Sequence, residues 1–180
     1  YNKKCFMLVL LYSFFVSESF ALATQEVIIL ADDDYPPYAF VENGKARGIY
    51  VDIVKEAAKL LVPHYKVKIA AYPWKRALYE IKKGTAFAIL PPYQHINKRP
   101  YIWPYSVQIL KEEVFAFCNK DINLVEHINA KTTKRKHPIV IGVNAGYLLL
   151  NKKLKQAKQE NKIVIAENKS TQSKLTLIHI

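Results

Sequence analysis

Three adjacent carboxylates in the stretch ADDDYPPYAF, residues 31–40, stand beside three aromatic side chains and two prolines. A carboxylate can pair with the ammonium group of a ligand, and an aromatic face can hold a cation or an apolar group. Solvent exposure explains each of Asp32, Asp33 and Asp34 equally well when the residue is considered alone. The stretch therefore indicates a binding loop only if other residues with binding chemistry lie beside it.

Further residues with binding chemistry follow segments that have the composition of buried strands. They are Trp74, Gln94, Arg99, Asn144 and Gly146. The guanidinium of Arg99 could hold a carboxylate through two parallel hydrogen bonds, and Trp74 offers an aromatic face. Each also has a structural interpretation, with Trp74 packing a helix onto a sheet and Gly146 serving a turn. Together with Asp32 and Tyr35, the set suits a small zwitterion or another polar molecule.

Parallel strands and helices are expected to position these residues. Short apolar, β-branched runs predict strands over Glu26–Leu30, Tyr65–Ala71, Ala86–Leu90, Val114–Cys118, Pro138–Val143 and Lys162–Ala166. Apolar residues at helical spacing predict helices over Ile49–Val62, Trp74–Lys83 and Tyr147–Gln159, and a helix beginning within Ser170–Ile178. This alternation is typical of an α/β fold with helices on both faces of a parallel sheet. Ligands bind such sheets at the carboxyl ends of the strands, where the candidate residues lie.

A composition change after Cys118 divides the chain into two regions. Residues 119–137 show no strong periodicity and contain the basic cluster KTTKRKH, after which the pattern of strands and helices restarts. We therefore expect a first α/β lobe over residues 24–118 and a second lobe over residues 119–180.

Residues 1–23 have the layout of a secretory signal peptide. Two lysines precede the apolar run CFMLVLLYSFFV, which is short for a membrane span, and residues 21–23, ALA, supply the small residues of a cleavage site. We expect cleavage before Thr24 and export of the mature chain to the periplasm. Cleavage leaves Cys118 as the only cysteine, which excludes an internal disulfide, and we expect its side chain to be buried on a strand.

The chain is strongly basic, with a formal net charge of +12. Such a charge can attract nucleic acid, an anionic membrane or an acidic ligand, but the lysines are scattered and no aromatic-rich nucleic-acid motif accompanies them. The five histidines are dispersed, without the spacing of a metal site. We therefore expect a solvated basic surface, no nucleic-acid partner, no metal and no other cofactor. No Ser-His-Asp or Cys-His arrangement has the motif context of a catalytic site, so no catalytic residue is expected.

The segment ADDDYPPYAFVENGKARGIYVDIVKEAAKLL resembles the beginning of the periplasmic solute-binding proteins of family 3, the polar amino-acid class that serves ABC importers. The resemblance continues through YPWKRALYEIKKG, KRPYIWPYS and LKEEVFAFC, and HPIVIGVNAGYLL is similar to the opening of the second lobe. It implies a type II periplasmic-binding-protein fold with two lobes of mixed and parallel sheet. It also implies a non-catalytic monomer that captures a small polar, amino-acid-like ligand for the membrane subunits of an ABC importer.

The resemblance implies a role for each candidate residue. Asp32 stands where the acid of the family meets a ligand ammonium, and Arg99 stands at the carboxylate clamp. Tyr35 and Trp74 occupy the positions of stacking aromatic residues. The residues expected to close over the ligand from the second lobe are Asn144 and Gly146.

The chain also departs from the family pattern. Phe87 stands in place of an aspartate, Ile96 in place of a threonine and Pro92 in place of a small residue, while Gln94 could supply a polar contact in the same loop. The segment by which the second lobe of the family returns to the first is not found before Ile180, so we expect an incomplete second lobe.

Four other functions stay open at this point. One is an enzyme on the same scaffold, either dehydratase-like or the remnant of a lytic transglycosylase. Another is the sensor lobe of a signalling receptor. A third is a basic nucleic-acid binder, against which the export signal argues. The last is a truncated fragment without function.

Overall fold

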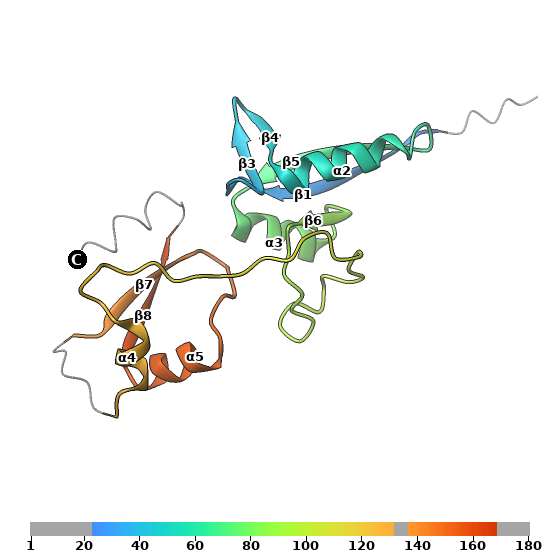
Figure 1. Cartoon of the computed structure of the whole chain (residues 1–180). Coiled ribbons are helices and arrows are strands. Elements are labelled where there is room, and N and C mark those ends of the chain that lie inside the picture. Colours follow the sequence, from blue (N-terminus) through green and yellow to red (C-terminus); the bar gives the residue numbers. More distant parts are fainter. Residues whose placement is uncertain (1–22, 132–136, 169–180) are drawn as a thin grey trace, which may run out of the picture.

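Two α/β units follow one another along the chain in the computed structural model, which describes residues 23–131 and 137–168 (Figure 1). The first unit contains the elements from β1 to β6, and the second contains those from α4 to β8. Between Leu90 and Leu124 the chain forms no helix or strand. Residues 1–22 of the expected signal peptide and the helix expected within Ser170–Ile178 lie outside the described residues.

β1 (Gln25–Asp32) is the central strand of the first sheet. It pairs in parallel with β5 (Tyr65–Tyr72) along its whole length and with β6 (Ala88–Leu90) near its carboxyl end. The predicted parallel sheet is therefore confirmed. The continuous apolar runs indicated it because a parallel sheet is covered on both faces.

Helices α2 (Ile49–Lys59) and α3 (Trp74–Lys83) cover opposite faces of this sheet (Figure 1). Successive side chains of a strand point to opposite faces. Leu30 therefore packs into the apolar cluster that includes α3, and Ala31 packs into the cluster that includes α2. Burial of a side chain such as Leu30 contributes roughly 1.5–3 kcal/mol, so these two clusters hold the carboxyl end of β1 in place.

The ends of the two helices follow local backbone chemistry. α3 ends at Gly84, whose φ of 74° is the left-handed conformation that glycine adopts at many helix ends, as the sequence predicted. α2 was predicted to reach Val62 but ends at Lys59. A proline disfavours helical geometry in the residue before it, and Pro63 thus stops the helix before Val62.

A small antiparallel sheet, which the sequence analysis did not predict, carries the acidic and aromatic loop. It consists of β2 (Asp34–Tyr35), β3 (Ala39–Glu42) and β4 (Lys45–Arg47). The turn between β3 and β4 is Asn43-Gly44, in which both residues have positive φ. Asn-Gly is the preferred pair for such a two-residue turn, so this signal was present in the sequence.

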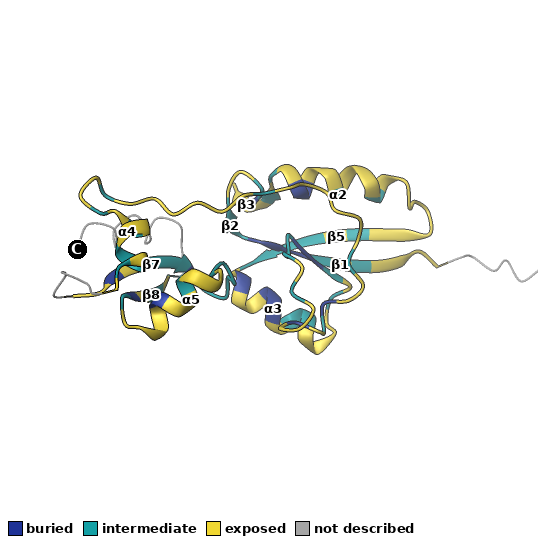
Figure 2. Ribbon diagram, turned by 60° about the horizontal axis from the view of Figure 1, so that its bottom comes forward, coloured by how far each residue is buried: buried dark blue, intermediate teal, exposed yellow. Residues whose placement is uncertain are grey.

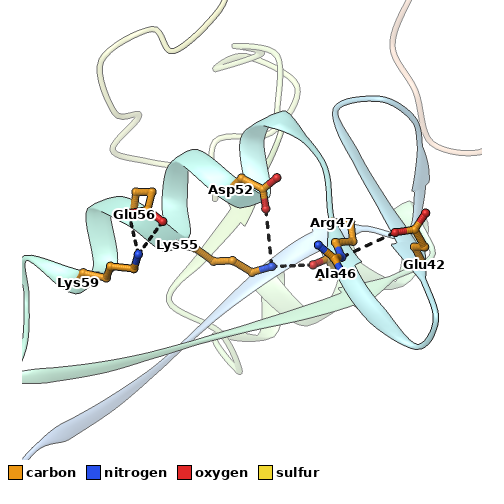
Figure 3. A network of polar contacts seen from close by, with 7 residues as sticks. All are labelled: Glu42, Ala46, Arg47, Asp52, Lys55, Glu56 and Lys59. Carbon is orange, nitrogen blue, oxygen red and sulfur yellow. Dashed lines mark hydrogen bonds and ion pairs between the residues drawn. The ribbon is translucent and has the colours of Figure 1, made fainter.

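Helix α2 holds the β3–β4 hairpin through side chains at the surface (Figure 3). Lys55 Nζ donates to the carbonyl oxygen of Ala46 at 2.8 Å and lies 3.8 Å from Asp52 Oδ1. Within the hairpin, Arg47 Nε lies 3.8 Å from Glu42 Oε2. These ion pairs are exposed and each contributes little, so the hairpin depends mainly on the packing of Ala39 and Ala46 against the α2 cluster.

The second unit is a two-stranded parallel sheet covered on one face. β7 (Ile139–Asn144) pairs with β8 (Ile163–Asn168), and the covering helices are α4 (Leu124–Asn129) and α5 (Lys152–Gln159). Alternate strand residues face these helices and form a buried cluster with Ala157. On the other face, Val140 and Val164 are exposed.

Two predictions for this half of the chain were wrong. Val114–Cys118 is not a strand, because β propensity needs a hydrogen-bonded neighbour and no described strand pairs with this segment. Cys118 is consequently exposed rather than buried. The helix predicted from Tyr147 begins only at Lys152, because Asn151 caps it by accepting a hydrogen bond from Leu154 N at 2.9 Å.

Helix α4 was not predicted, although the sequence contains a recognisable signal for its start. Asn123 accepts a hydrogen bond from Glu126 N at 3.1 Å, and its amide donates to the Glu126 carboxylate at 3.2 Å. An Asn followed three residues later by Glu is related to the capping box, which marks helix starts.

Gly48 lies where the chain passes from the hairpin into α2, and its backbone approaches Tyr38 closely. Its φ of 116° is outside the range that other residues adopt readily, and a Cβ there would overlap the carbonyl group of Tyr38. Gly44 also has a positive φ, of 71°, but open space surrounds its missing Cβ.

We expect Gly48→Ala to lower the free energy of unfolding by roughly 2–4 kcal/mol, from backbone strain and the collision with Tyr38. The matched control Gly44→Ala should cost only about 1 kcal/mol, because it brings strain without a collision. Urea denaturation followed by circular dichroism measures both. Equal costs for the two variants would contradict the close approach.

Candidate ligand-binding site

The carboxyl end of β1 is the most deeply buried part of that strand, while its start is exposed (Figure 2). Asp32, the last residue of the strand, is only 3% exposed, and its Oδ1 accepts a hydrogen bond from Asp34 N at 3.1 Å. Burial raises the pKa of this carboxyl above its ordinary value of 3.8. A buried carboxylate is costly for a fold, and groups of this kind gather at functional sites.

Tyr147 links Asp32 to aromatic rings of the first unit. Tyr147 of the second unit donates its hydroxyl to Asp32 Oδ2. The ring of Tyr147 meets Tyr35 of β2 edge-on at 5.7 Å between centroids and Trp74 at the start of α3 at 6.0 Å. Burial, followed by the charge of Asp32, raises the pKa of the Tyr147 hydroxyl, so this phenol stays protonated and acts as the donor.

Arg99 places a positive charge in the same region. The residue is 7% exposed, and its Nη2 donates to the carbonyl oxygen of Gly146. Its guanidinium carbon lies 5.8 Å from the centre of the Trp74 ring. No ion pair found within residues 23–131 and 137–168 includes Arg99. Burial lowers the pKa of Arg99 below its ordinary value.

The second unit reaches these groups through the turn that follows β7. Gly146 has a φ of 84°, and a Cβ there would lie 3.0 Å from Lys75 Cγ and 3.3 Å from Trp74 Cδ1. A side chain at this position would press against the side chains of Lys75 and Trp74, and the positive φ also favours glycine. Nearby, Lys75 Nζ of α3 forms an ion pair of 2.6 Å with Glu167 Oε2 of β8.

We call Asp32, Tyr35, Trp74, Arg99, Gly146 and Tyr147 the junction cluster. Five of its six members were predicted from the sequence, and the contacts above bring them together. Asn144, also predicted, ends β7 and is buried, with its Oδ1 lacking a hydrogen-bond partner in the described part of the chain. Its backbone oxygen accepts from Tyr147 N at 3.0 Å, so Asn144 lies directly beside the cluster.

Gln94, the remaining predicted residue, lies outside the cluster. It is exposed and lines a neighbouring hollow of about 360 Å³ between the loop after β6 and the segment before α5. Basic groups line this hollow, including His95, Lys98 and Lys155. Burial, followed by the charges of Arg99 and Lys98, lowers the pKa of His95.

The three departures from the family pattern are not members of the junction cluster. Phe87 is exposed immediately before β6, and its backbone N donates to Ile28 O at 2.8 Å. Ile96 lines the hollow beside Gln94. Pro92 is half-buried in the loop between β6 and Gln94.

Sequence reasoning missed two residues of this region, Tyr147 and Glu112. The Glu112 carboxylate, in the segment that joins the two units, accepts hydrogen bonds from two phenols of the first unit and from Tyr93 of the same segment. The distances are 2.6 Å from Tyr35 and 2.7 Å from Tyr93, and Tyr50 donates to the other oxygen. Burial, followed by the hydrogen bond to Glu112, raises the pKa of all three tyrosines. Glu112 thus fastens the connecting segment to the unit that carries Tyr35.

The described residues contain no group of three His, Cys, Asp or Glu side chains placed to hold a metal ion. Among the helices that the structure describes, none has the length and apolar character needed to cross a bilayer.

Two α/β units that meet at buried charges and aromatic rings define a type II periplasmic-binding-protein fold. The chain belongs to the bacterial extracellular solute-binding proteins, family 3, because the model of that family matches residues 27–169. The resemblance seen in the sequence is thereby confirmed. None of the curated proteins compared with the chain matches it significantly.

Solved structures share this fold at low sequence identity. An ancestral amino acid-binding protein, a precursor of cyclohexadienyl dehydratase, is 19% identical with a TM-score of 0.60, covering 86% of this chain and 65% of that one. An arginine transport system periplasmic binding protein from Legionella pneumophila is 14% identical with a TM-score of 0.64, covering 87% and 64%. A Salmonella typhimurium periplasmic binding protein with high arginine specificity is 13% identical with a TM-score of 0.59, covering 87% and 65%. The chain thus spans just under two thirds of the length of each.

We expect Glu112→Ala to lower the free energy of unfolding by roughly 2–4 kcal/mol, because three phenols lose their shared acceptor. Limited proteolysis within residues 106–119 should accelerate, since the segment loses its attachment. Glu113→Ala removes a neighbouring exposed carboxylate and serves as the control. Equal rates of cleavage in the two variants would show that Glu112 does not hold the segment.

Proposed function

We propose that the chain is a solute receptor of an ABC importer, which binds an amino-acid-like ligand between its two units and presents it to the membrane subunits. Residues 24–118 form the first lobe in this proposal, and residues 119–180 belong to the second. Family membership supports the binding role, and the similarity to amino acid-binding structures supports the ligand class. The receptor acts as a monomer without catalysis.

One observation carries this proposal. Asp32 and Arg99 are buried side chains of opposite charge. Asp32 contacts the neutral hydroxyl of Tyr147, and Arg99 contacts the neutral carbonyl of the preceding residue, Gly146. A free amino acid brings an ammonium and a carboxylate that complement these charges. A charged ligand group adds the attraction between opposite charges, which a neutral hydroxyl or carbonyl does not supply, so the ligand would replace both groups favourably.

The aromatic residues of the junction cluster suit the rest of such a ligand. Trp74 and Tyr35 present rings to Tyr147, whose hydroxyl reaches the Asp32 carboxylate, and rings hold cationic or apolar side chains. The buried Oδ1 of Asn144 offers a further acceptor at the second unit. We therefore assign ligand-binding roles to Asp32, Tyr35, Trp74, Arg99, Asn144 and Gly146, with Gln94 contacting the ligand from the neighbouring loop.

A thermal-shift screen of amino acids, polyamines, organic acids and sugars identifies the ligand, because binding to the folded state raises its melting temperature. With that ligand, we expect Arg99→Ala and Asp32→Asn each to weaken binding by roughly 2–5 kcal/mol in titration calorimetry. Asp32→Asn should also raise stability at neutral pH. Since burial raises the pKa of Asp32, the folded wild type loses stability as the pH rises from 3.8 through that raised value, and the substitution removes this loss.

Two exposed residues provide matched controls for these variants, Arg47→Ala and Asp121→Asn. Both should leave affinity and the pH dependence of the melting temperature unchanged. Wild-type affinity in both Arg99→Ala and Asp32→Asn would place the ligand site elsewhere on the chain.

The proposed location in the periplasm rests on the sequence of residues 1–23. We expect protein recovered from the periplasm of an expressing bacterium to have the intact mass of a chain that begins at Thr24. Recovery of only the unprocessed chain, from the cytoplasm, would contradict export.

A further inference from the structure

Tyr147 occupies the position that the proposed function gives to the ligand. Its hydroxyl donates to the buried Asp32 carboxylate, and its ring stands edge-on between Tyr35 and Trp74, with interplanar angles of 80° and 75°. It also packs against the buried apolar cluster that contains Leu78. These contacts use the same charge and the same two rings that a bound amino acid would use.

We infer that Tyr147 is a built-in occupant of the ligand site, and that it sets affinity and selectivity by competing with the ligand. This inference rests on the proposed function, since it concerns the same site. When a competent state is only a fraction of the population, apparent affinity falls by that fraction. Every ligand that reaches Asp32 must first displace the phenol.

The backbone around Tyr147 allows such a displacement. The residue follows Gly146, which has a positive φ, and precedes the cap of α5 at Asn151, so no helix includes it. Its backbone N donates to Asn144 O at 3.0 Å, which holds the turn through the backbone and does not depend on the side chain. Release of Tyr147 therefore does not require unfolding of β7 or α5.

The competition also selects the chemistry of the ligand. The phenol gives Asp32 a hydrogen bond from a neutral donor, and a ligand must supply at least an equal donor to replace it. An ammonium or guanidinium does so because it adds the attraction of a positive charge to its hydrogen bond, whereas a neutral amide brings no charge. The site should thus accept free amino acids and reject the same molecules when the amino group is acetylated.

The chain offers a direct optical test of occupancy. Its two tryptophans are Trp74, which Tyr147 covers, and Trp103, which is exposed. In a Trp103→Phe background, Trp74 is therefore the only tryptophan. Tyr147→Ala should increase the quenching of Trp74 fluorescence by acrylamide, and Tyr147→Phe, which keeps the ring, should not. Tyr79→Ala is the control, because it removes an exposed tyrosine from α3, the helix that carries Trp74.

Calorimetry with arginine, glutamine and N-acetylglutamine then measures the competition in the same variants. We expect Tyr147→Phe to bind arginine and glutamine roughly tenfold more tightly than the parent, because the hydrogen bond to the charged Asp32 is lost. Tyr147→Ala should bind both at least as tightly as Tyr147→Phe does. N-acetylglutamine should bind neither the parent nor either of these two variants. Tighter binding in both variants, with wild-type affinity in Tyr79→Ala, supports the inference.

Three results would overturn it, in distinguishable ways. Unchanged Trp74 quenching in Tyr147→Ala would show that the side chain does not cover the site. Binding of arginine or glutamine by the parent that is unchanged or weakened in Tyr147→Phe would reject competition while leaving the proposed function intact. Absence of binding by every variant, at any concentration tested, would reject the proposed function and the competition together.

Discussion

The removal of Asp32 and Arg99 from water is the constraint on which the contact between the two units depends. An isolated buried charge is costly, and a fold keeps one only when hydrogen bonds compensate for the lost water. In the described part of the chain neither residue forms an ion pair with the other or with a third residue. The second unit supplies the missing hydrogen bonds through Gly146 and Tyr147, which fixes where its β7 turn must lie.

This constraint explains why the junction has its particular composition. Gly146 leaves room for the side chains of Trp74 and Lys75, and Tyr147 is long enough to reach a carboxylate at the end of β1. The hydrogen bonds of Asp32 and Arg99 at the junction are made with neutral groups, which supply no opposite charge. This incomplete compensation of charge is the feature on which the proposed binding of a zwitterion rests.

Local patterns were sufficient to predict the parallel sheet and the two helices of the first unit, but its small antiparallel sheet was not predicted. The apolar runs of β1 and β5 and the spacing of α3 each record burial within a few neighbouring residues, and the strand-end rule then located Asp32, Trp74 and Arg99. The rest depended on contacts between distant residues. Val114–Cys118 has the composition of a strand, but no described strand pairs with it. The composition of a segment does not indicate whether a partner strand lies beside it. The contact between Tyr147 and Asp32 spans 115 positions, so no local signal could indicate it.

Glu112 matters for more than the stability of one loop. The segment between Leu90 and Leu124 joins the two units without a helix or strand, and Glu112 fastens it to the first unit near its middle. Only the part after Glu112 is then left as a tether for the second unit. A short tether keeps its two ends at a high effective concentration, on the order of millimolar. The second unit therefore meets the first as an intramolecular partner, and a few weak contacts such as the ion pair between Lys75 and Glu167 are enough to keep the two in register.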